Sequence, residues 1–424
     1  MLSRQDNERL TRIGADTPMG QVFRRYWLPA LLSSELAQPD GAPVRLRLLG
    51  EPLVAFRDTS GAVGLVDAFC PHRRAPMFLG RNEKCGLRCV YHGWKFDRSG
   101  ACLEMPTEPR DSAYKTKVRI KAYPVWEGGG MVWTYMGPAA EMPAPPDMEL
   151  TRAPATHRFV SRTVQDCNYL QALEGGLDSA HATILHNMTV GDLSWLDDYE
   201  RTTPRLDVQL TDYGLQYSGT RVLNGRYWVR VYQYIMPSTQ LRGRIAPVRG
   251  EKAPPKIPLI SGHVWAPNDD VTTSVFNFSY SADPNIPLTT EFALASETDY
   301  GRGPDDLTPD FRLRKNSAND FLIDRDAQRQ RTFTGISGIN TQDVAVQEGM
   351  GPIADRSEEH LGSTDRAIVM MRRLLLEATR AVEAGGKPRG AGSTSYRSLR
   401  AVDHFADSEA EISQLIAREL AARF

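Results

Sequence analysis

Two short segments of this chain each place one cysteine beside one histidine. The segments Cys70-x-His72 and Cys89-x-x-His92 are separated by sixteen residues, and each offers one thiolate and one imidazole. A [2Fe–2S] cluster in which two histidines replace two cysteines on one of the irons needs this set of ligands. Imidazole raises the potential to roughly −150 to +300 mV, against about −400 mV for the all-cysteine plant type. The pattern therefore predicts a cluster that accepts electrons from a donor of lower potential and can pass them to a ferrous centre.

A structural zinc site is the alternative for the same residues, since two cysteines and two histidines also satisfy tetrahedral zinc. Zinc fingers usually hold both cysteines in one segment and both histidines in the other, whereas each segment here is mixed. Pro71 after the first cysteine, and Gly93-Trp94 after the last histidine, also resemble the two loops of Rieske domains. We therefore favour the iron–sulfur cluster. The spacing of Cys85 to Cys89 fits no second iron pair, so we expect Cys85 to be a packed free cysteine.

A second group of metal-ligating residues lies in the segment Glu174-x3-Asp178-x2-His181-x4-His186. Two histidines and one carboxylate that leave neighbouring positions open form the non-haem Fe(II) site of oxygenases. Because a five-residue spacing does not keep both histidines on one helix face, we expect a break or irregular turn between His181 and His186. Zinc is the rival metal, and hydrogen-bonded polar residues are the alternative without a metal. A cluster upstream needs an electron acceptor, which favours iron here.

Length and composition describe a two-domain globular protein. A chain of 424 residues exceeds one ordinary domain and supplies ample core for two. The net charge of −1 gives no indication of binding to nucleic acid or to a membrane surface. No stretch approaches eighteen apolar residues, the N-terminus has no signal-peptide core, and five scattered cysteines do not form a disulfide framework. We therefore expect a cytoplasmic protein with no nucleic-acid or membrane partner.

The first part of the chain is predicted to be an antiparallel β domain. After a helical segment over residues 1–26, short strands separated by turns run from residue 44 through the two cysteine–histidine loops. Proline then accumulates over residues 137–154, which marks a linker. We therefore expect a first domain over residues 1–155 and a second over residues 156–424.

The second part of the chain mixes helices and strands. A helical stretch over residues 165–186 precedes strands with alternating apolar residues over 206–281. Residues 281–310 are loop-rich, with four prolines, and the remainder turns helical. This order predicts an α+β fold, in which a catalytic domain has a central antiparallel sheet flanked by helices.

Together and in this order, the two motifs resemble those of the large (alpha) subunits of Rieske non-haem iron aromatic ring-hydroxylating oxygenases. The resemblance covers nearly the whole chain and is nearest to the phthalate dioxygenase-like branch, on the segments RYWLPALLSSEL, VRLRLLGEPLVAFRD, CGLRCVYHGWKFD and NTQDVAVQEGMGPIADRSEEHLGSTD. It implies a [2Fe–2S] Rieske cluster and a mononuclear Fe(II). The implied ligands are Cys70, His72, Cys89 and His92 for the cluster, and His181 and His186 for the mononuclear iron.

The resemblance also implies a third iron ligand in the late block, where Asp343 and Asp355 are both available. In the family this carboxylate follows a polar residue and begins an apolar-spaced helix, and Gln342-Asp343-Val344-Ala345-Val346 has that form. Asp355 adjoins Arg356, and we expect it to be ion-paired on a turn, so we favour Asp343. Asp178 is implied to bridge the metal centres of neighbouring subunits, the alternative being a solvated surface acid. The bridge predicts a homo-oligomer, either a trimer or stacked trimers.

The activity implied by the resemblance is that of a terminal oxygenase component. It uses O2 and reductase-supplied electrons to cis-dihydroxylate an aromatic carboxylate, which is phthalate, a phthalate isomer or a substituted benzoate. The chain has no phosphate-binding glycine motif after a strand, so we expect a separate NAD(P)H-dependent flavin/ferredoxin reductase. A Rieske monooxygenase that removes an O-methyl or aryl-ether group is the alternative. A simple Rieske electron carrier would not need the long chain beyond the linker.

An aromatic carboxylate needs a cationic partner in an apolar pocket, and arginine meets it best through a two-pronged planar contact. The candidates follow the predicted central strands, although a surface position is the default for any one arginine. We favour Arg244, then Arg205, with Arg242 and Arg249 as further candidates and Ser179 as a hydroxyl contact.

Three positions depart from the pattern of the branch. Arg74 and Pro76 stand in the first cluster loop where glycine and serine are usual, and Gly349 stands where serine is usual. A larger, charged Arg74 could alter the face that the cluster presents to a reductase or a neighbouring subunit, and Gly349 could alter the helix near the iron. The expected metal ligands are unaffected, whereas the identity of the substrate becomes less certain.

Overall fold

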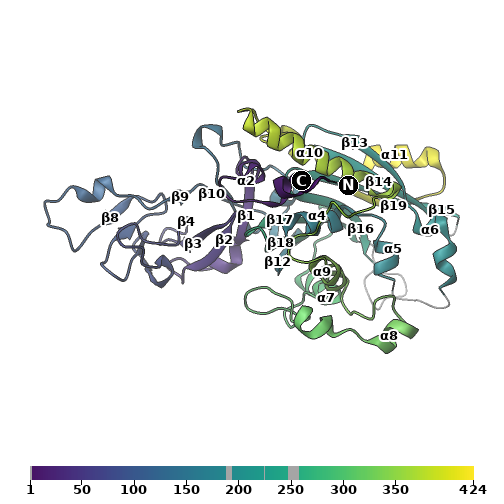
Figure 1. The fold of residues 1–424 in the computed structure, drawn as a ribbon, viewed down its shortest axis with the longest axis horizontal. Coiled ribbons are helices and arrows are strands. Elements are labelled where there is room, and N and C mark those ends of the chain that lie inside the picture. The colour runs from purple at the N-terminus through teal and green to yellow at the C-terminus, as the bar shows by residue number, and fades with distance from the viewer. Residues whose placement is uncertain (1, 188–192, 224, 247–256) are drawn as a thin grey trace.

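The computed structural model describes residues 2–187, 193–223, 225–246 and 257–424. These residues form an elongated molecule, in which a β-rich part from the first third of the chain extends from a larger part that mixes helices and strands (Figure 1). Both chain ends lie on the larger part (Figure 1). None of the helices in these ranges is long and apolar enough to span a membrane.

The β-rich part is built from short strands: β2 (Val44–Leu48), β3 (Glu51–Arg57), β4 (Val63–Asp67), β5 (Arg81–Glu83), β6 (Gly86–Arg88), β7 (Lys95–Phe96), β8 (Cys102–Glu104) and β9 (Ala122–Tyr123). They form two antiparallel sheets with the orders β2-β3-β4-β9 and β5-β6-β7-β8. Phe56, Leu87 and Phe96 are fully buried in a core that also contains Cys70 and Cys89. The two cysteine–histidine loops are therefore anchored in the core of this part through their cysteines.

A third small sheet and the N-terminal helices join this part to the rest. The sheet has the order β1-β11-β10, with β1 (Trp27–Leu32), β10 (Val125–Gly128) and β11 (Met131–Tyr135). The helices α1 (Arg4–Thr11) and α2 (Pro18–Phe23) begin at the side-chain caps Ser3 and Thr17. Both pack against α10 (Arg366–Glu383). The N-terminal segment, helical as predicted, thus contacts the C-terminal part of the chain.

The larger part has a central antiparallel sheet, as predicted. Its strands are β12 (Arg158–Gln165), β13 (Arg205–Leu210), β14 (Gly214–Leu223), β15 (Arg226–Ile235), β16 (Thr239–Ala246), β17 (Ile257–Pro267), β18 (Thr273–Ser281) and β19 (Val402–Ala406). Within the described ranges the order is β12-β18-β17-β16-β15-β14-β13, and β19 also pairs with β15. The register sets Arg242 opposite Tyr232 on one side and Ser261 on the other, and sets His263 opposite Asn277.

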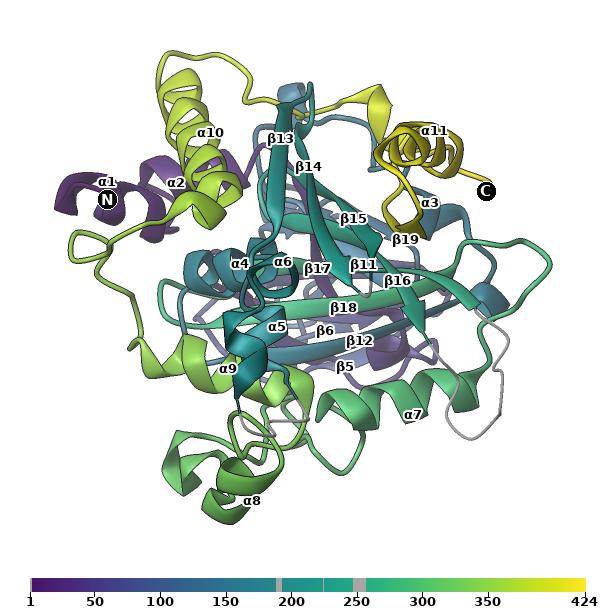
Figure 2. The ribbon, with the colours of Figure 1, turned by 90° about the vertical axis from the view of Figure 1, so that its right-hand side faces the viewer.

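Helices flank this sheet, and several lie over one face (Figure 2). The helices of the larger part are α3 (Glu149–Arg152), α4 (Tyr169–Leu177), α5 (Ala182–Leu185), α6 (Tyr199–Thr202), α7 (Thr290–Tyr300), α8 (Arg325–Gln330), α9 (Ile339–Gly349), α10 and α11 (Glu409–Glu419). The prediction of a loop-rich segment over residues 281–310 is wrong for α7, because the four prolines flank this helix without interrupting it. Thr289 caps α7, and Gly301 ends it with a φ of 76°.

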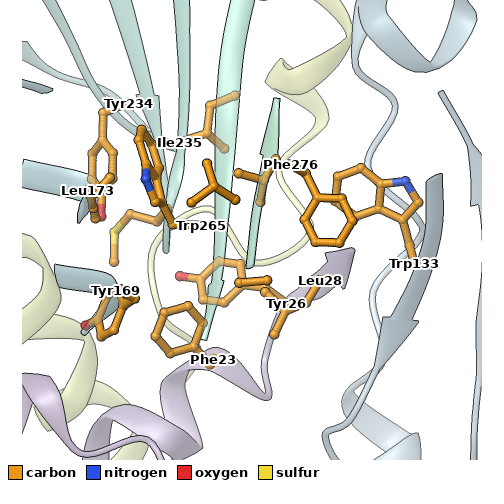
Figure 3. Packing of buried hydrophobic residues seen from close by; sticks show 14 of the residues in the cluster. Phe23, Tyr26, Leu28, Trp133, Tyr169, Leu173, Tyr234, Ile235, Trp265 and Phe276 are labelled. Carbon is orange, nitrogen blue, oxygen red and sulfur yellow. The ribbon is translucent and has the colours of Figure 1, made fainter. Parts of the chain in front are cut away.

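An aromatic core joins α2, β1 and α4 to the central sheet (Figure 3). The ring of Phe23 meets the ring of Tyr169 edge-on, with 4.8 Å between ring centroids. Trp265 and Phe276 of the sheet are also buried in this core. Each large side chain buried in this way contributes about 1.5–3 kcal/mol. The core therefore holds α4, which leads into the His181 segment, firmly against the sheet.

Candidate metal centres

Two tight loops present the first set of predicted ligands. Each loop is closed by a backbone hydrogen bond in which the cysteine N–H is the donor, from Cys70 to the carbonyl of Ala75 (2.9 Å) and from Cys89 to the carbonyl of Trp94 (2.8 Å). Both cysteine side chains are buried. The two cysteines therefore lie in the interior, whereas His72 and His92 are half-buried.

The rings of His72 and His92 meet edge-on, with 4.4 Å between their centroids and an interplanar angle of 66°. Trp94 stacks on His72 at 4.2 Å with an interplanar angle of 9°, and the ring of Tyr91 lies 3.9 Å from that of His92. These contacts fix the planes of both imidazoles. The Nδ1 atom of His72 is buried and has no hydrogen-bond partner within the part of the chain described. An unpaired buried ring nitrogen is unfavourable unless it binds something, which fits a metal ligand.

Burial also affects the ionisation of the Cys70 thiol. Burial, together with the adjacent Cys89 sulfur, raises the pKa of the Cys70 thiol to about 11. The Cys70 thiol would hold its proton at neutral pH, whereas a coordinating metal deprotonates a thiol outright. With the unpaired His72 nitrogen, this donor set fits a [2Fe–2S] cluster. Cys85, in contrast, is exposed, and its φ is 56°, so the prediction that it is packed is wrong.

Backbone conformation explains one departure in the first cluster loop. Arg74 has a φ of 58°, a left-handed conformation that glycine adopts easily and other residues adopt at a cost of about 1–2 kcal/mol. Its guanidinium lies over the ring of Phe69 at 4.8 Å, and its side chain is 62% exposed, so the charge stays at the surface beside the cluster loops. Pro76 precedes a short 3₁₀ turn. Gly349 has open space around it, and no contact explains its replacement of serine.

A second set of ligands converges around α5. His181 and His186 stand at the two ends of this single helical turn, with 5.1 Å between their ring centroids. The predicted break between the two histidines is wrong. The break lies before His181, because α4 ends at Leu177 and Asp178 has an extended backbone. Since each histidine flanks the turn, both rings can reach the same point.

Asp343 of α9 completes this second set. Its Oδ1 atom lies 3.4 Å from Nε2 of His181 and 3.2 Å from Nε2 of His186. One ligand atom from each of the three residues lies within 4.8 Å of the others, and this is the single such group found among the described residues. The helix begins at Ile339, so Asp343 lies inside it and not at its start. Two histidines and one carboxylate are the donor set of a non-haem Fe(II) site.

The electrostatics of this group favour a bound cation. Burial raises the pKa of the Asp343 carboxyl, but hydrogen bonds from His181 and His186 outweigh it and hold this pKa well below its usual range. Burial also disfavours charge on His181, yet the carboxylates of Asp178 and Asp343 raise the pKa of His181 to about 10. Positive charge, whether a proton or a metal ion, is therefore stabilised at this point.

Gln342 supports the second set, a role that the sequence did not reveal. Its Nε2 donates to the carbonyl of Ile336 (2.8 Å), so its Oε1 faces His186 and accepts from Nδ1 of that ring (2.7 Å). The proton on Nδ1 leaves Nε2 of His186 free for a metal. Outer partners of this kind orient metal-ligating histidines. Its position next to Asp343 in the chain is the only signal that could have identified it.

Asp178 holds the other histidine in the same way. Its Oδ2 atom lies 3.3 Å from Nδ1 of His181, and its Oδ1 accepts the backbone N–H of Ala180 at 2.7 Å. This contact turns Nε2 of His181 toward Asp343. The Asp178 side chain is 24% exposed, so it is neither fully solvated nor fully enclosed.

Glu174 and Asp355 are placed away from the metal ligands. Glu174 is buried and accepts from Arg356 (2.9 Å) and Arg372 (2.6 Å), which ties α4 to α10 and to the segment after α9. Asp355 accepts from the N–H and hydroxyl of Ser357 at 3.0 and 2.6 Å. The expected ion pair of Asp355 with Arg356 is wrong, because the guanidinium of Arg356 is directed inward to Glu174.

A cavity lies beside His181 and Asp343, between the central sheet and the helices. Its wall includes Arg242, His263, Trp265, Arg302, Asn340 and Val344. It encloses about 40 Å³, whereas a cavity of about 150 Å³ holds benzene. Binding of an aromatic ring in this cavity therefore requires that some of these side chains move.

The arginines predicted to contact a substrate fall in different places. Arg242 lines the cavity and forms no ion pair or hydrogen bond with another side chain of the described ranges. The Arg244 guanidinium lies 4.7 Å over the ring of Tyr300, and Arg244 lines a different cavity. Arg205 is on the surface, where it pairs with Glu409 at 2.6 Å. The structure therefore favours Arg242 over Arg244 and corrects the expectation for Arg205, which a charge partner holds outside.

Of the remaining two candidates, Ser179 is not among the residues that line this cavity. The Ser179 hydroxyl is buried and lies 3.1 Å from the hydroxyl of Tyr232 and 3.4 Å from Nη1 of Arg221. These neighbours, and not the cavity, occupy its hydrogen-bonding capacity. Arg249 lies outside the described residues.

The fold and the two ligand sets define a class of protein. A β domain with paired cysteine–histidine loops, followed by a helix-flanked antiparallel sheet that carries two histidines and an aspartate, is the architecture of Rieske non-haem iron oxygenases. Comparisons with known families agree, since the Rieske [2Fe-2S] domain matches residues 26–124 and the family described as "LigXa C-terminal domain like" matches residues 134–406. The chain belongs to the Rieske oxygenase family, as an oxygenase subunit, and carries a [2Fe–2S] cluster and a mononuclear iron.

Three curated relatives illustrate this membership. The phthalate 4,5-dioxygenase oxygenase subunit of Pseudomonas putida is 39% identical, over 94% of this chain and 91% of the relative. The 3-chlorobenzoate-3,4-dioxygenase oxygenase subunit of Comamonas testosteroni is 38% identical, over 90% of each chain. The 5,5'-dehydrodivanillate O-demethylase oxygenase subunit of a Sphingobium species is 34% identical, over 92% of this chain and 83% of the relative. Because they are subunits of multicomponent enzymes, a separate reductase supplies the electrons.

Solved structures show the same fold. Dicamba monooxygenase bound to dicamba is 22% identical and superposes with a TM-score of 0.60, over 85% of this chain and 98% of that chain. The predictions of the family, the α+β architecture, the oxygenase class and the two cofactors are confirmed.

Proposed function

We propose that this oxygenase subunit cis-dihydroxylates an aromatic carboxylate, and the observation that carries this substrate class is the guanidinium of Arg242. It lines the cavity at His181 and Asp343 without an acidic partner among the described side chains. Burial, followed by the charges of Arg230 and Arg302, lowers the pKa of Arg242 to about 10, so it still carries its charge at neutral pH. An unpaired cation in such a site is unfavourable, and a substrate carboxylate removes that cost through a two-pronged contact.

The relatives support the same class of substrate. Two of them are named for phthalate and for 3-chlorobenzoate, which are both aromatic carboxylates. The proposal assigns the carboxylate to Arg242 and the reacting edge of the ring to the side of the cavity formed by His181 and Asp343. Trp265 and Val344 supply apolar surface that excludes water from the ring.

We assign the metal ligands from the geometry above: Cys70, His72, Cys89 and His92 for the cluster, and His181, His186 and Asp343 for the mononuclear iron. When bound, the iron supplies the activation of O2 beside the substrate. The residues of the chain orient the ring through Arg242 and hold the two imidazoles through Gln342 and Asp178.

A charge deletion at Arg242 tests the substrate class. Loss of one partner of a buried charged pair costs about 2–5 kcal/mol, so Arg242→Gln should raise the KM for the preferred aromatic carboxylate at least about thirtyfold. Arg205→Gln, which removes an exposed arginine, is the matched control and should leave KM unchanged, and Arg244→Gln separates the two neighbours on β16. Iron and sulfide content should be normal in all three. An unchanged KM in Arg242→Gln for every benzoate and phthalate isomer tested would remove Arg242 from substrate binding.

Monooxygenation is the second candidate, since one relative is named an O-demethylase oxygenase subunit. This alternative removes an O-methyl or aryl-ether group from an aromatic acid. Turnover under ¹⁸O2 separates the two reactions, because dioxygenation leaves two labelled atoms in one product and monooxygenation leaves one. An aromatic product with fewer than two labelled atoms would replace the proposed reaction by the alternative, because O-demethylation places its single labelled atom in the released formaldehyde.

We further infer a homo-oligomer, a trimer or stacked trimers, in which the cluster loops of one subunit face Asp178 of the next. A second cavity of about 210 Å³ opens at Asp178 and His181, and Val346 and Met350 give it an exposed apolar border. Its wall also contains the acids Glu359 and Asp365.

The surface around the cluster loops is complementary to that cavity. Val90 and Tyr91 are exposed apolar residues beside the cluster histidines, and Arg73 and Arg74 are exposed cations. Apolar residues can thus meet apolar residues while cations meet acids. Sedimentation of the purified holoprotein tests the inference. A monomer that turns over substrate at the rate of the intact enzyme would refute the bridging role of Asp178.

We further infer the electron donor, the compartment and the domain division of this protein. Electrons come from a separate NAD(P)H-dependent flavin/ferredoxin reductase, which reconstitution with purified reductases can test. The protein works in the cytoplasm, without nucleic-acid or membrane partners, which fractionation can test. The domains span residues 1–155 and 156–424, and limited proteolysis should cut between residues 137 and 154, although α1 and α2 pack against α10.

A further inference from the structure

The segment between β8 and β9 gathers positive charge on the β-rich part, toward the end that points away from the larger part (Figure 1). Four exposed cations of this segment form no ion pair with an acid of the described ranges: Arg110, Lys115, Lys117 and Arg119. The exposed acid Asp111 is their nearest neighbour of opposite charge in the sequence. Because the whole chain has a net charge of −1, this excess belongs to one surface and not to the composition.

Hydrogen bonds hold these cations along the hairpin of β7 and β8. Arg119 forms an antiparallel bridge with Ala101, and its guanidinium donates to the carbonyl of Ser99 at 2.6 Å. The Nζ atom of Lys115 donates to the carbonyl of Leu103 at 3.4 Å. Since carbonyl groups are neutral acceptors, both side chains are positioned while their positive charge stays available to a partner.

Aromatic contacts connect the same segment to the cluster ligands. Tyr114 begins the 3₁₀ turn Tyr114–Lys117 and is 48% exposed. Its ring meets the ring of Trp94 edge-on, with 6.2 Å between centroids, and Trp94 in turn stacks on His72 at 4.2 Å. The three rings therefore connect the surface among the cations to a proposed cluster ligand. An exposed tyrosine within a charged rim is typical of a surface that binds another protein.

We propose that Tyr114 and the four cations, together called the basic patch, form the docking surface for the acidic face of the protein that delivers electrons. The inference rests on the separate reductase inferred above and adds the surface that it meets and the charge of its donor face. Complementary charge steers the encounter, and Tyr114 supplies the apolar centre of the contact. Each encounter oxidises the donor by one electron and reduces the cluster by one electron, and no bond forms or breaks at this surface.

The basic patch differs from the surface assigned above to the neighbouring subunit. That surface includes Val90 and Tyr91, and the ring of Tyr91 lies 3.9 Å from the ring of His92. The basic patch reaches the cluster through Trp94 and His72 instead. Electrons therefore enter beside one histidine and leave beside the other, so the donor and the neighbouring subunit do not compete for the same residues.

Stopped-flow reduction of the holoprotein under argon tests the docking surface without substrate turnover. The probe is a reduced plant-type [2Fe–2S] ferredoxin with an acidic surface, and the change in visible absorbance of the cluster gives a second-order rate constant. At an ionic strength of about 0.01 M, where the Debye length is about 30 Å, Lys115→Glu/Lys117→Glu should lower this constant at least about tenfold. At about 1 M salt the difference from the wild-type protein should shrink to less than about twofold. The milder Lys115→Gln/Lys117→Gln should give an intermediate constant at low salt.

Controls separate docking from changes in total charge and in the cluster itself. Arg325→Glu/Arg329→Glu on the exposed helix α8 of the larger part changes the net charge equally and should lower the constant less than about twofold. Reduction by the methyl viologen radical, a small cationic donor, should not slow in any variant, and the midpoint potential of the cluster should not change. Tyr114→Ala should slow reduction by the ferredoxin about fivefold at both salt concentrations, whereas Tyr114→Phe, which keeps the ring, should stay within about twofold.

Failure of this inference is distinguishable from failure of the separate reductase. Equal reduction of the wild-type protein and Lys115→Glu/Lys117→Glu by the ferredoxin, or an equal loss in the α8 control, would overturn the docking surface and leave the reductase in place. Dissociation of the oligomer of Lys115→Glu/Lys117→Glu on sedimentation would overturn it as well, because the basic patch would then belong to the subunit interface. If no protein donor reduces the cluster although the methyl viologen radical does, the separate reductase itself fails, and the inference fails with it.

Discussion

Replacing Gln342 by leucine is expected to weaken iron binding without removing any of the three proposed ligands. Gln342 accepts from Nδ1 of His186 at 2.7 Å and donates to the carbonyl of Ile336 at 2.8 Å. Leucine has a similar volume but can do neither, so the Nδ1–H of His186 is left buried without an acceptor. The ring also loses the contact that turns its Nε2 toward Asp343.

The size of the effect follows from two independent magnitudes. Leaving one buried donor unsatisfied costs about 1–3 kcal/mol. Removing an outer partner of a metal-ligating histidine typically lowers metal affinity about 10- to 100-fold, which is about 1.4–2.8 kcal/mol. The two ranges overlap, so the dissociation constant for Fe(II) should rise between about tenfold and a hundredfold.

Competition with a chromophoric Fe(II) chelator under argon measures this constant, and the visible spectrum of the cluster shows that the β domain is intact. Gln347→Leu on the same helix is the matched control. It removes a hydrogen bond that Gln165 of β12 donates (3.1 Å), and the side chain of Gln347 forms no hydrogen bond with a proposed ligand among the described residues. It should change the iron affinity less than about threefold. Gln342→Glu, which keeps an acceptor for His186, should bind iron better than Gln342→Leu.

Two results would refute this reasoning. Iron affinity in Gln342→Leu equal to that of the wild-type protein would show that the contact with His186 does not support the site. An equal loss in Gln347→Leu would show that the effect comes from a weakened α9 and not from the imidazole.

Three further predictions concern the two metal centres and the β domain. Asp343→Ala should lose the mononuclear iron and keep the visible spectrum of the cluster, so full iron occupancy by metal analysis would show the assignment wrong. Asp178→Asn should keep the cluster and the iron content but slow product formation in a single turnover by a factor of about ten or more. The reason is that the substitution weakens the partner of His181 and also interrupts the proposed bridge for electrons between subunits. A normal rate would show that Asp178 only supports His181. Hydrogen bonds from Lys95, and then from Arg88, lower the pKa of Glu104 to about 2, below its value of about 4.3 in an unfolded chain. These interactions therefore stabilise the folded domain above about pH 4.3. Their contribution is lost as the pH falls toward 2. Glu104→Gln should therefore lower the Tm at pH 7, with a difference from the wild-type protein that shrinks below pH 4.5; a constant difference would contradict the depressed pKa.

Parts of this protein could be predicted because they depend on short-range pattern. The alternation of apolar residues predicted β2, β3 and β4, and the apolar spacing of the C-terminal segments predicted α10 and α11. Other elements could not be predicted in this way. The helix α7 has no strong apolar face, and β19 is a short strand whose pairing with β15 depends on residues about 175 positions apart.

The sequence by itself determined the types of metal-binding groups and their local arrangement, because ligands two, three or five positions apart meet wherever the loop or turn between them forms. The resemblance then favoured Asp343 over Asp355, but only the tertiary structure brings the Asp343 carboxylate, 157 residues beyond His186, to both imidazoles. The tertiary structure also decided that Arg242 lines the cavity while Arg205 is on the surface. These properties depend on how α4, α9 and the central sheet pack against one another. They also depend on the partner that each polar side chain meets in that packing. The spacing of residues along the chain encodes neither the packing nor the partners.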